Sequence, residues 1–295
     1  MSAIRPRRSV LYMPGSNARA LEKARGLAAD GIIIDLEDAV APDAKDAARD
    51  QALAAVKGGG YGRREVVIRA NGLGTPWGEA DLKAAAASGA DAVLLPKVQS
   101  PGDLQSARAV LAASGARADL ALWAMMETPL AILNAAEIAA AGPIDPFPLT
   151  VFVMGTNDLA KETRASLDGG RAGMLSWLST CIAAGRAYGI EVLDGVFNSI
   201  GDEAGLRAEC EQGRLSGMDG KTFVHPSQIA PCNAAFSPAA EEVAWAHKII
   251  AAFALPENAG KGVIMVEGRM AEIMHADMAR RTVGIAEAIA GMKPG

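Results

Sequence analysis

The chain has 295 residues, half of them hydrophobic, and a formal net charge of −5. This length suits one large α/β barrel or two ordinary domains, and the apolar content is enough for a sizeable core. The acidic balance argues against a nucleic-acid-binding protein, because such proteins need clustered Lys and Arg. The basic cluster of Arg5, Arg7 and Arg8 is too short to serve as a nucleic-acid arm.

Signals for export or membrane insertion are weak. No apolar run approaches the ~20 residues that a membrane-spanning helix needs. The basic cluster is followed by a short apolar run and then Pro14-Gly15, which does not fit a cleavable signal peptide. Cys181, Cys210 and Cys232 are odd in number and show no close pair in the sequence, as is typical of reduced thiols. We therefore expect a cytoplasmic protein without a membrane segment.

Short apolar runs alternate with Ala-rich helical stretches along most of the chain. The runs that predict strands are residues 9–13, 31–36, 65–70, 92–96, 120–126, 150–154, 191–196 and 222–224. The predicted helices are residues 18–29, 44–56, 79–88, 104–113, 132–140, 172–188 and 203–212. Continuous apolar runs indicate strands buried on both faces, which is typical of parallel sheets. The pattern predicts a closed (β/α)₈ TIM barrel over residues 1–232.

An open, doubly wound sheet is the rival architecture. It normally carries a Gly-rich phosphate-binding turn after its first strand. That place holds Pro14-Gly15-Ser16-Asn17, which does not match a G-x-G-x-x-G motif. The closed barrel is therefore the preferred fold.

Residues 233–295 predict a C-terminal extension that serves as a lid and oligomerisation segment. Ser237-Pro238 followed by Glu241 and Glu242 is a good helix start, with an N-cap hydroxyl, Pro at the first helical position and acids in the first turn. We expect this helix to reach Phe253, then a loop over 256–262, a strand over 263–266 and a helix over 273–290. Such an extension often covers the mouth of a barrel, its own or a neighbour's.

Glu127 and Asp158 each follow a predicted strand, at the end where such barrels place their active sites. Helix capping is the alternative interpretation, although a Glu directly before Thr128-Pro129 makes a poor cap. Two carboxylates and a few waters form a typical Mg²⁺ site, whose open positions would accept a 2-hydroxy or 2-keto acid. The three histidines are poorly placed to act as ligands, which argues against zinc.

Arg69 and Lys97 end the third and fourth predicted strands. Structural neutralisation of nearby carboxylates is one role for both. Arg69 is also suited to holding a carboxylate, a thioester oxygen or a developing enolate, because its guanidinium stays charged. A Schiff-base role for Lys97 is disfavoured, because several carboxylates at one mouth would raise the pKa of its amino group.

Asp35, Glu37 and Asp38 form a dense acidic group after the second predicted strand. Strand alternation would point Asp35 and Glu37 the same way and Asp38 the opposite way. Each could orient a water, accept a proton or pair with Arg69 and Lys97. At least one of them is expected to be mainly structural.

Taken together, these segments resemble the citrate lyase β-subunit-like family, also called the HpcH/HpaI aldolase superfamily. The resemblance covers nearly the whole chain, and the combined pattern is specific although no single piece is. The matching segments are Tyr12-Met13-Pro14-Gly15-Ser16, Ile34-Asp35-Leu36-Glu37-Asp38-Ala39-Val40, Ile68-Arg69-Ala70-Asn71, Leu95-Pro96-Lys97-Val98, Met126-Glu127-Thr128-Pro129, Gly155-Thr156-Asn157-Asp158-Leu159, Gly220-Lys221-Thr222-Phe223-Val224-His225-Pro226 and Gly268-Arg269-Met270.

The resemblance implies a TIM barrel with Mg²⁺, or Mn²⁺ as a substitute, on Glu127 and Asp158. It implies that Arg69 contacts the acyl group and that basic side chains such as Lys97 approach coenzyme A beside Pro14-Gly15-Ser16. It also implies a homotrimer or homohexamer in which the C-terminal segment closes over a neighbour's site. Glu37-Asp38 stands where the plain aldolase branch carries a catalytic histidine, which favours the CoA-thioester branch.

The tail departs from the family pattern at one position. Lyases of this family usually present an Asp shortly after Gly-(Lys/Arg)-Met as the acid/base, whereas here Glu272 follows, with Asp277 five residues later. The leading hypothesis is Mg²⁺-dependent cleavage of malyl-CoA or citramalyl-CoA to acetyl-CoA and a 2-keto acid, with Arg69, Glu37, Asp38 and Glu272 (or Asp277) as catalytic groups. The alternatives are a malyl-CoA thioesterase using the same metal site, and a citrate lyase β-like subunit of a larger complex.

Overall fold

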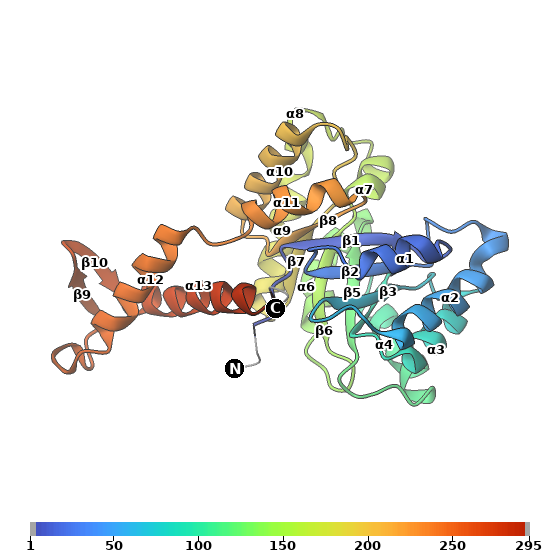
Figure 1. Ribbon diagram of the computed structural model, residues 1–295, viewed down its shortest axis with the longest axis horizontal. Helices are drawn as coiled ribbons and strands as arrows, with labels where there is room; N and C mark the ends of the chain where they lie inside the picture. Colours follow the sequence, from blue (N-terminus) through green and yellow to red (C-terminus); the bar gives the residue numbers. More distant parts are fainter. Residues whose placement is uncertain (1–3, 293–295) are drawn as a thin grey trace. The chain divides into compact units, whose positions relative to one another are not determined.

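The computed structural model describes residues 4–292, which form two compact units. One unit spans residues 7–235, and the other comprises the chain from Phe236 onward with the residues that precede Arg7. The first unit contains a closed barrel in which each strand pairs in parallel with the next and β8 pairs with β1 (Figure 1). Its strands are β1 Ser9–Pro14, β2 Gly31–Asp35, β3 Glu65–Arg69, β4 Ala92–Leu95, β5 Ala121–Met126, β6 Leu149–Met154, β7 Glu191–Asp194 and β8 Gly220–Phe223.

Helices follow the strands and cover the outside of the barrel (Figure 1). The fold is therefore the predicted (β/α)₈ barrel, which places the carboxyl ends of all eight strands at one mouth. Its helices are α1 Ala18–Ala24, α2 Lys45–Gly58, α3 Gly78–Ser88, α4 Pro101–Ala113, α5 Pro129–Leu133, α6 Ala135–Ala140, α7 Thr156–Thr163, α8 Asp168–Arg171, α9 Leu175–Ala187, α10 Glu203–Ser216 and α11 Ile229–Ala235.

The barrel interior is a packed apolar core. Val10, Ile33, Val67, Trp123 and Leu193 lie in one fully buried cluster, contributed by strands around the ring. These inward positions alternate with outward ones, which face the helices. The interior is therefore filled by side chains below the mouth.

Arg7 closes the opposite end of this core. Its guanidinium lies 5.5 Å from the centre of the Trp123 ring and pairs with Glu65 and Glu191, each at 2.6 Å. Glu65 and Glu191 are the first residues of β3 and β7. This charge cluster therefore belongs to the end of the barrel away from the mouth.

The sequence located all eight strands to within two residues at each end. The single helix predicted over 132–140 is instead two helices, α5 and α6, separated at Asn134. Thr128 caps α5 by accepting from the Ala131 amide, and Pro129 occupies its first position. The short helices α8 and α11 were not expected from the sequence.

The second unit contains α12 Ala240–Phe253, a hairpin of β9 Val263–Val266 and β10 Arg269–Glu272, and α13 Ile273–Gly291. The two helices pack through Ala246, Ile249, Ala276 and Ala279. The predicted N-cap at Ser237 is wrong. Ala239 is the N-cap of α12, and its amide donates to Glu242 Oε2 at 2.9 Å, so the acid of the first turn caps the helix. Over the described part of the chain, no helix combines the length and apolar character needed to span a bilayer.

Candidate active site

A cavity of about 360 Å³ opens among the loops that follow the barrel strands. The carboxylates of Asp35, Asp38, Glu127 and Asp158 line it, together with the guanidinium of Arg69. Apolar walls face them, contributed by β5, β6 and the segments after β7 and β8, and they comprise Met125, Met154, Val196 and Val224. The mouth of the barrel is thus an acidic pocket with one buried cation.

Glu127 follows β5 directly and is 1% exposed. Its Oε1 accepts a hydrogen bond from the backbone amide of Lys97 at 2.7 Å. Lys97 adopts a left-handed backbone with φ 49°, a conformation that non-glycine residues rarely hold without compensation. Burial, with repulsion from Glu37 and Asp158, raises the pKa of Glu127 to about 7. The charged form of Glu127 is therefore disfavoured by its surroundings, and the cap of α5 is Thr128 and not Glu127.

Asp158 lies in the first turn of α7, immediately beyond β6. Its carboxylate is not the N-cap, because the cap position belongs to Gly155. Gly155 packs directly against Glu127, so that a Cβ at Gly155 would lie 2.2 Å from the Cβ of Glu127. The glycine therefore lets the ends of β5 and β6 bring Glu127 and Asp158 into one cavity.

Arg69 ends β3 and is held by carboxylates on every side. Its Nε and Nη2 donate to Asp35 at 2.7 and 2.6 Å, in a bidentate pair. Nη1 lies 2.9 Å from Glu37 Oε2 and 3.3 Å from Asp38 Oδ2. The guanidinium also stacks on Tyr12, 5.0 Å from the ring centre. These contacts fix the guanidinium at the pocket wall.

The expected alternation of Asp35, Glu37 and Asp38 is wrong, because all three carboxylates contact Arg69. β2 ends at Asp35, and the chain then turns, with the amides of Glu37 and Ala39 donating to the Asp35 carboxylate. Both carboxylate oxygens of Asp35 accept hydrogen bonds from these amides and from Arg69. Asp35 therefore has the mainly structural role expected of one member of the group. Asp38 is 62% exposed and faces the cavity.

Lys97 does not line this cavity. Its amino group lies 3.0 Å from Glu37 Oε1, and its side chain borders a neighbouring cavity of about 310 Å³. Burial lowers the pKa of Lys97, but attraction by Glu37, Glu127 and Asp158 outweighs it and holds that pKa above its ordinary value. A charged ammonium is a poor nucleophile, so these contacts argue against a Schiff-base role for Lys97.

The remaining predicted residues lie in different environments. Pro14 lines the cavity, and Gly15 is buried where its amide donates to Asp35 O at 2.8 Å. Ser16 is exposed at the rim of the barrel. In the other unit, Glu272 is the N-cap of α13 and Asp277 pairs with Arg280 at 2.6 Å. The catalytic roles expected for Glu272 and Asp277 stay predictions.

The sequence did not single out several residues that build the pocket. Tyr12 supplies the ring beneath Arg69, and its hydroxyl donates to Met125 Sδ at 3.4 Å. Asn157 and Thr222 also line the cavity. Each occurs in a segment of the family resemblance, but an uncharged side chain carries no signal of its own.

The donor set suits a hard divalent cation. Asp38, Glu127 and Asp158 line the cavity, and Glu37 lies beside it against Arg69 and Lys97. Once Arg69 is matched with Asp35, Lys97 compensates for only one of these four carboxylates. Burial raises the pKa of Glu127 first and repulsion from Glu37 and Asp158 adds to it, and a bound cation would favour the charged carboxylate. Among residues 4–292, no group of three or more His, Cys, Asp or Glu side chains is arranged as a metal cage. Two carboxylates that leave positions for water and substrate match Mg²⁺, which keeps part of its hydration.

The closed barrel and its acidic mouth are those of an α/β-barrel enzyme. The sequence pattern of the HpcH/HpaI aldolase/citrate lyase family matches residues 8–226, and that of C–C bond lyases of the TIM-barrel fold matches residues 174–290. The chain therefore belongs to the HpcH/HpaI aldolase/citrate lyase family of enzymes.

Named relatives refine this placement. A (3S)-malyl-CoA thioesterase from Cereibacter sphaeroides is 51% identical over 98% of this chain and 97% of the relative. An L-malyl-CoA/beta-methylmalyl-CoA lyase from the same species is 32% identical over 97% of this chain and 96% of the relative. The crystal structure of CitE from Mycobacterium tuberculosis with magnesium, acetoacetate and coenzyme A superposes with a TM-score of 0.73, at 30% identity, and the match covers 94% of this chain and 97% of that one.

Proposed function

We propose that this protein hydrolyses the thioester of a malyl-CoA-type substrate in an Mg²⁺-dependent reaction. The observation that carries the proposal is the 51% identity to a (3S)-malyl-CoA thioesterase over nearly the full length, against 32% to the lyase. The same pocket could serve either reaction, so the geometry does not choose between them. The higher identity to the thioesterase gives the hydrolase precedence over the lyase that the sequence pattern first favoured.

Glu127 and Asp158 would hold the cation, Mg²⁺ or Mn²⁺ in its place. When bound, the metal supplies a Lewis acid at the hydroxy-acid end of the substrate. The CitE complex with magnesium and coenzyme A supports this choice of cofactor and ligand. Pro14-Gly15-Ser16 and Lys97 are the proposed contacts of the CoA portion.

Arg69 would stabilise the negative charge that develops on the thioester oxygen, using Nη1, the nitrogen not shared with Asp35. Asp38, exposed to the cavity, would accept a proton from the attacking water. The water oxygen bonds to the carbonyl carbon and the C–S bond breaks. The leaving CoA thiolate takes up the proton that Asp38 accepted from the water, and the acid is released.

A lyase remains the second candidate function, because the C–C bond lyase pattern covers residues 174–290. In that reaction Glu37 or Asp38 would accept the hydroxyl proton and Arg69 would stabilise the thioester enolate. Glu272 (or Asp277) from the C-terminal unit would then protonate the enolate carbon.

We further propose a homotrimer or homohexamer in which the C-terminal unit closes over a neighbour's mouth. Its hairpin supports this idea, because Val263, Met265 and Met270 are 51%, 66% and 63% exposed and share one face. Helix α13 adds exposed Ile273 and Met274 next to Glu272. Apolar side chains gathered in this way are typical of interfaces. Light scattering of the purified protein tests the assembly, and a monomer at micromolar concentration would contradict it.

One assay separates the functions. Purified protein with Mg²⁺ and malyl-CoA should release free thiol without a keto acid trappable by phenylhydrazine, and EDTA should abolish the release. Keto acid without free thiol would establish the lyase instead. No reaction on free CoA thioesters would favour the subunit of a larger complex.

A further inference from the structure

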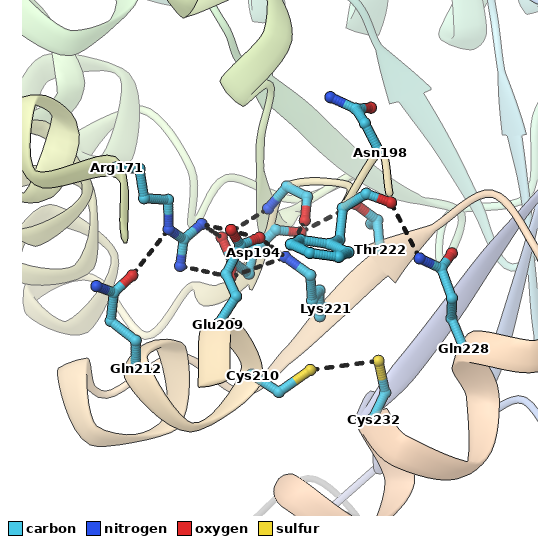
Figure 2. A network of polar contacts seen from close by, with 12 residues as sticks. Arg171, Asp194, Asn198, Glu209, Cys210, Gln212, Lys221, Thr222, Gln228 and Cys232 are labelled. Atoms are coloured by element: carbon cyan, nitrogen blue, oxygen red, sulfur yellow. Dashed lines mark hydrogen bonds and ion pairs between the residues drawn. The ribbon is translucent and has the colours of Figure 1, made fainter. Parts of the chain in front are cut away.

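A cluster of charged side chains lies buried on the outside of the barrel, between β7, β8 and helix α10 (Figure 2). Asp194 ends β7 and pairs in register with Lys221 of β8, and both are 0% exposed. Leu193 belongs to the interior core and Thr222 lines the cavity, so strand alternation turns Asp194 and Lys221 outward. This position separates the cluster from the carboxylates of the pocket.

Two cations and two carboxylates meet in this cluster. Arg171 Nη2 donates to Asp194 at 2.9 Å, while Lys221 donates to Asp194 at 3.1 Å and to Glu209 at 2.6 Å. Gln212 accepts from Arg171 Nε at 2.9 Å. Desolvation lowers the pKa of Lys221, but Asp194 and Glu209 outweigh it and raise that pKa above its ordinary value, so the ammonium persists.

Stability alone does not explain this arrangement. Apolar side chains of similar volume are often as stabilising as a buried ion cluster, because desolvation offsets the Coulomb attraction. Arg171 also reaches the cluster from a left-handed backbone, φ 52°, directly after Gly169 and Gly170 at φ 60° and 68°. Such strain in a non-glycine residue persists where the surroundings enforce it and tends to mark functional positions.

The cluster continues into the loop after β7. Lys221 donates its third hydrogen bond to the carbonyl of Gly195, the first residue of the segment 195–198, which we call the β7 loop. A Cβ at Gly195 would lie 2.5 Å from Thr156 Oγ1 and 2.7 Å from Met154 O. The β7 loop therefore lies against the turn that carries Asp158. Val196, the next residue, lines the cavity.

The far end of the β7 loop is held by two amide side chains. Gln228 Nε2 donates to Phe197 O at 2.9 Å (Figure 2). Asn198 and Asn157 exchange hydrogen bonds of 2.8 and 3.1 Å. Asn157 lines the cavity and directly precedes Asp158. The loop is thus held at Gly195 by the buried cluster and at Asn198 by Asn157, a residue that lines the pocket.

We propose that Lys221, supported by Asp194 and Arg171, is a positioning residue that fixes the β7 loop as the wall of the acyl end of the pocket. Lys221 acts through Gly195 on the placement of Val196, and Asn198 continues the support to Asn157 beside Asp158. The identity of the acyl ligand rests on the function proposed above. The role of the cluster in holding the loop does not depend on that proposed function.

The test compares Lys221→Met and Asn198→Ala with the control Arg7→Met, which removes a buried cation at the opposite end of the barrel. Hydrogen exchange of the peptide covering the β7 loop should quicken at least about tenfold in Lys221→Met and Asn198→Ala, and not in Arg7→Met. For malyl-CoA, kcat should fall by about tenfold to a hundredfold in both loop variants with little change in CoA binding.

The outcomes separate this proposal from the proposed function. Lys221→Met and Arg7→Met with equal losses of kcat, or unchanged exchange in the β7 loop, would overturn the positioning role. A wild-type protein inactive on thioesters would overturn only the function, because the exchange assay and calorimetric Mg²⁺ binding still report on the loop. If Lys221→Met does not fold, Gln212→Ala replaces it, since this change loosens Arg171 without deleting a charge.

Discussion

Gly155 and Glu127 are in such close contact that no other residue type fits at position 155. A Cβ there would lie 2.2 Å from the Cβ of Glu127 and 2.7 Å from its Oε2. The backbone of Gly155 has φ −96°, which any residue can adopt, so the requirement is for space and not for conformational freedom. The glycine permits the close approach of β5 and β6 that brings the two carboxylates of the proposed metal site together.

Gly155→Ala should therefore displace Glu127 and weaken Mg²⁺ binding by about tenfold or more, with a loss of about 1–3 kcal/mol in unfolding free energy from overpacking. Isothermal titration with Mg²⁺ measures the first effect and urea unfolding the second. Gly74→Ala is the control, because a Cβ at Gly74 meets nothing within 4 Å. Wild-type Mg²⁺ affinity in Gly155→Ala would show that Glu127 is not a ligand.

Glu127→Gln should stabilise the metal-free protein at alkaline pH. The pKa of Glu127 is about 7 in the folded chain against an ordinary 4.5. Between those values the folded state binds more protons than the unfolded state, so the free energy of unfolding falls as pH rises. The full effect is about 3 kcal/mol, from about 1.4 kcal/mol per pKa unit. Urea unfolding in EDTA should show the gain at pH 8 and not at pH 4.

Glu65→Gln provides the matched control for that experiment. Glu65 is as buried as Glu127, but it accepts two hydrogen bonds from Arg7, at 2.6 and 2.9 Å. Neutralising it should destabilise the protein at pH 8, because the buried guanidinium of Arg7 loses one of its two carboxylate partners and keeps only Glu191. A loss of stability in both variants would mean that Glu127 is a structural carboxylate.

Mg²⁺ affinity should depend on pH for the same reason. The cation competes with a proton on Glu127, so below the pKa of about 7 the apparent dissociation constant should rise by roughly tenfold per pH unit. Above pH 8 it should level off. Calorimetric titrations at pH 6, 7 and 8 give the slope. A flat profile would contradict proton competition at this carboxylate.

The barrel and its acidic mouth could be predicted because both leave local marks in the sequence. Strands buried on two faces appear as continuous apolar runs, such as the one before Asp35, and parallel topology places the residues that follow at one end. The presence of Glu127, Asp158, Arg69 and Asp38 at one cavity follows from these two facts alone.

Other features depend on contacts that local patterns do not encode. The turn after β2 is set by amides donating to Asp35 and by Lys45, which donates to Leu36 O at 2.8 Å. Arg171 meets Asp194 across 23 residues, from a segment without helical periodicity. The ring of Tyr12 beneath Arg69 is likewise a tertiary contact. The pattern of strand ends therefore predicts which charged residues lie at the mouth, but it does not predict their ion-pair partners.

Arg69→Lys should lower kcat/KM by about a hundredfold or more. Lysine cannot reproduce the bidentate contact with Asp35, the reach of Nη1 toward Glu37 or the stacking on Tyr12. Breaking this buried pair should also cost about 3 kcal/mol of unfolding free energy. Steady-state kinetics at saturating Mg²⁺ and urea unfolding measure the two effects.

Arg49→Lys is the control that separates catalysis from stability. Arg49 Nε donates to the fully buried Asp81 at 2.6 Å, a comparable ion pair, but Arg49 does not line the cavity. It should lose stability with little change in kcat/KM, since its guanidinium is remote from the developing charge on the thioester. If the two variants lost activity in proportion to their stability, Arg69 would hold the mouth together without stabilising the transition state.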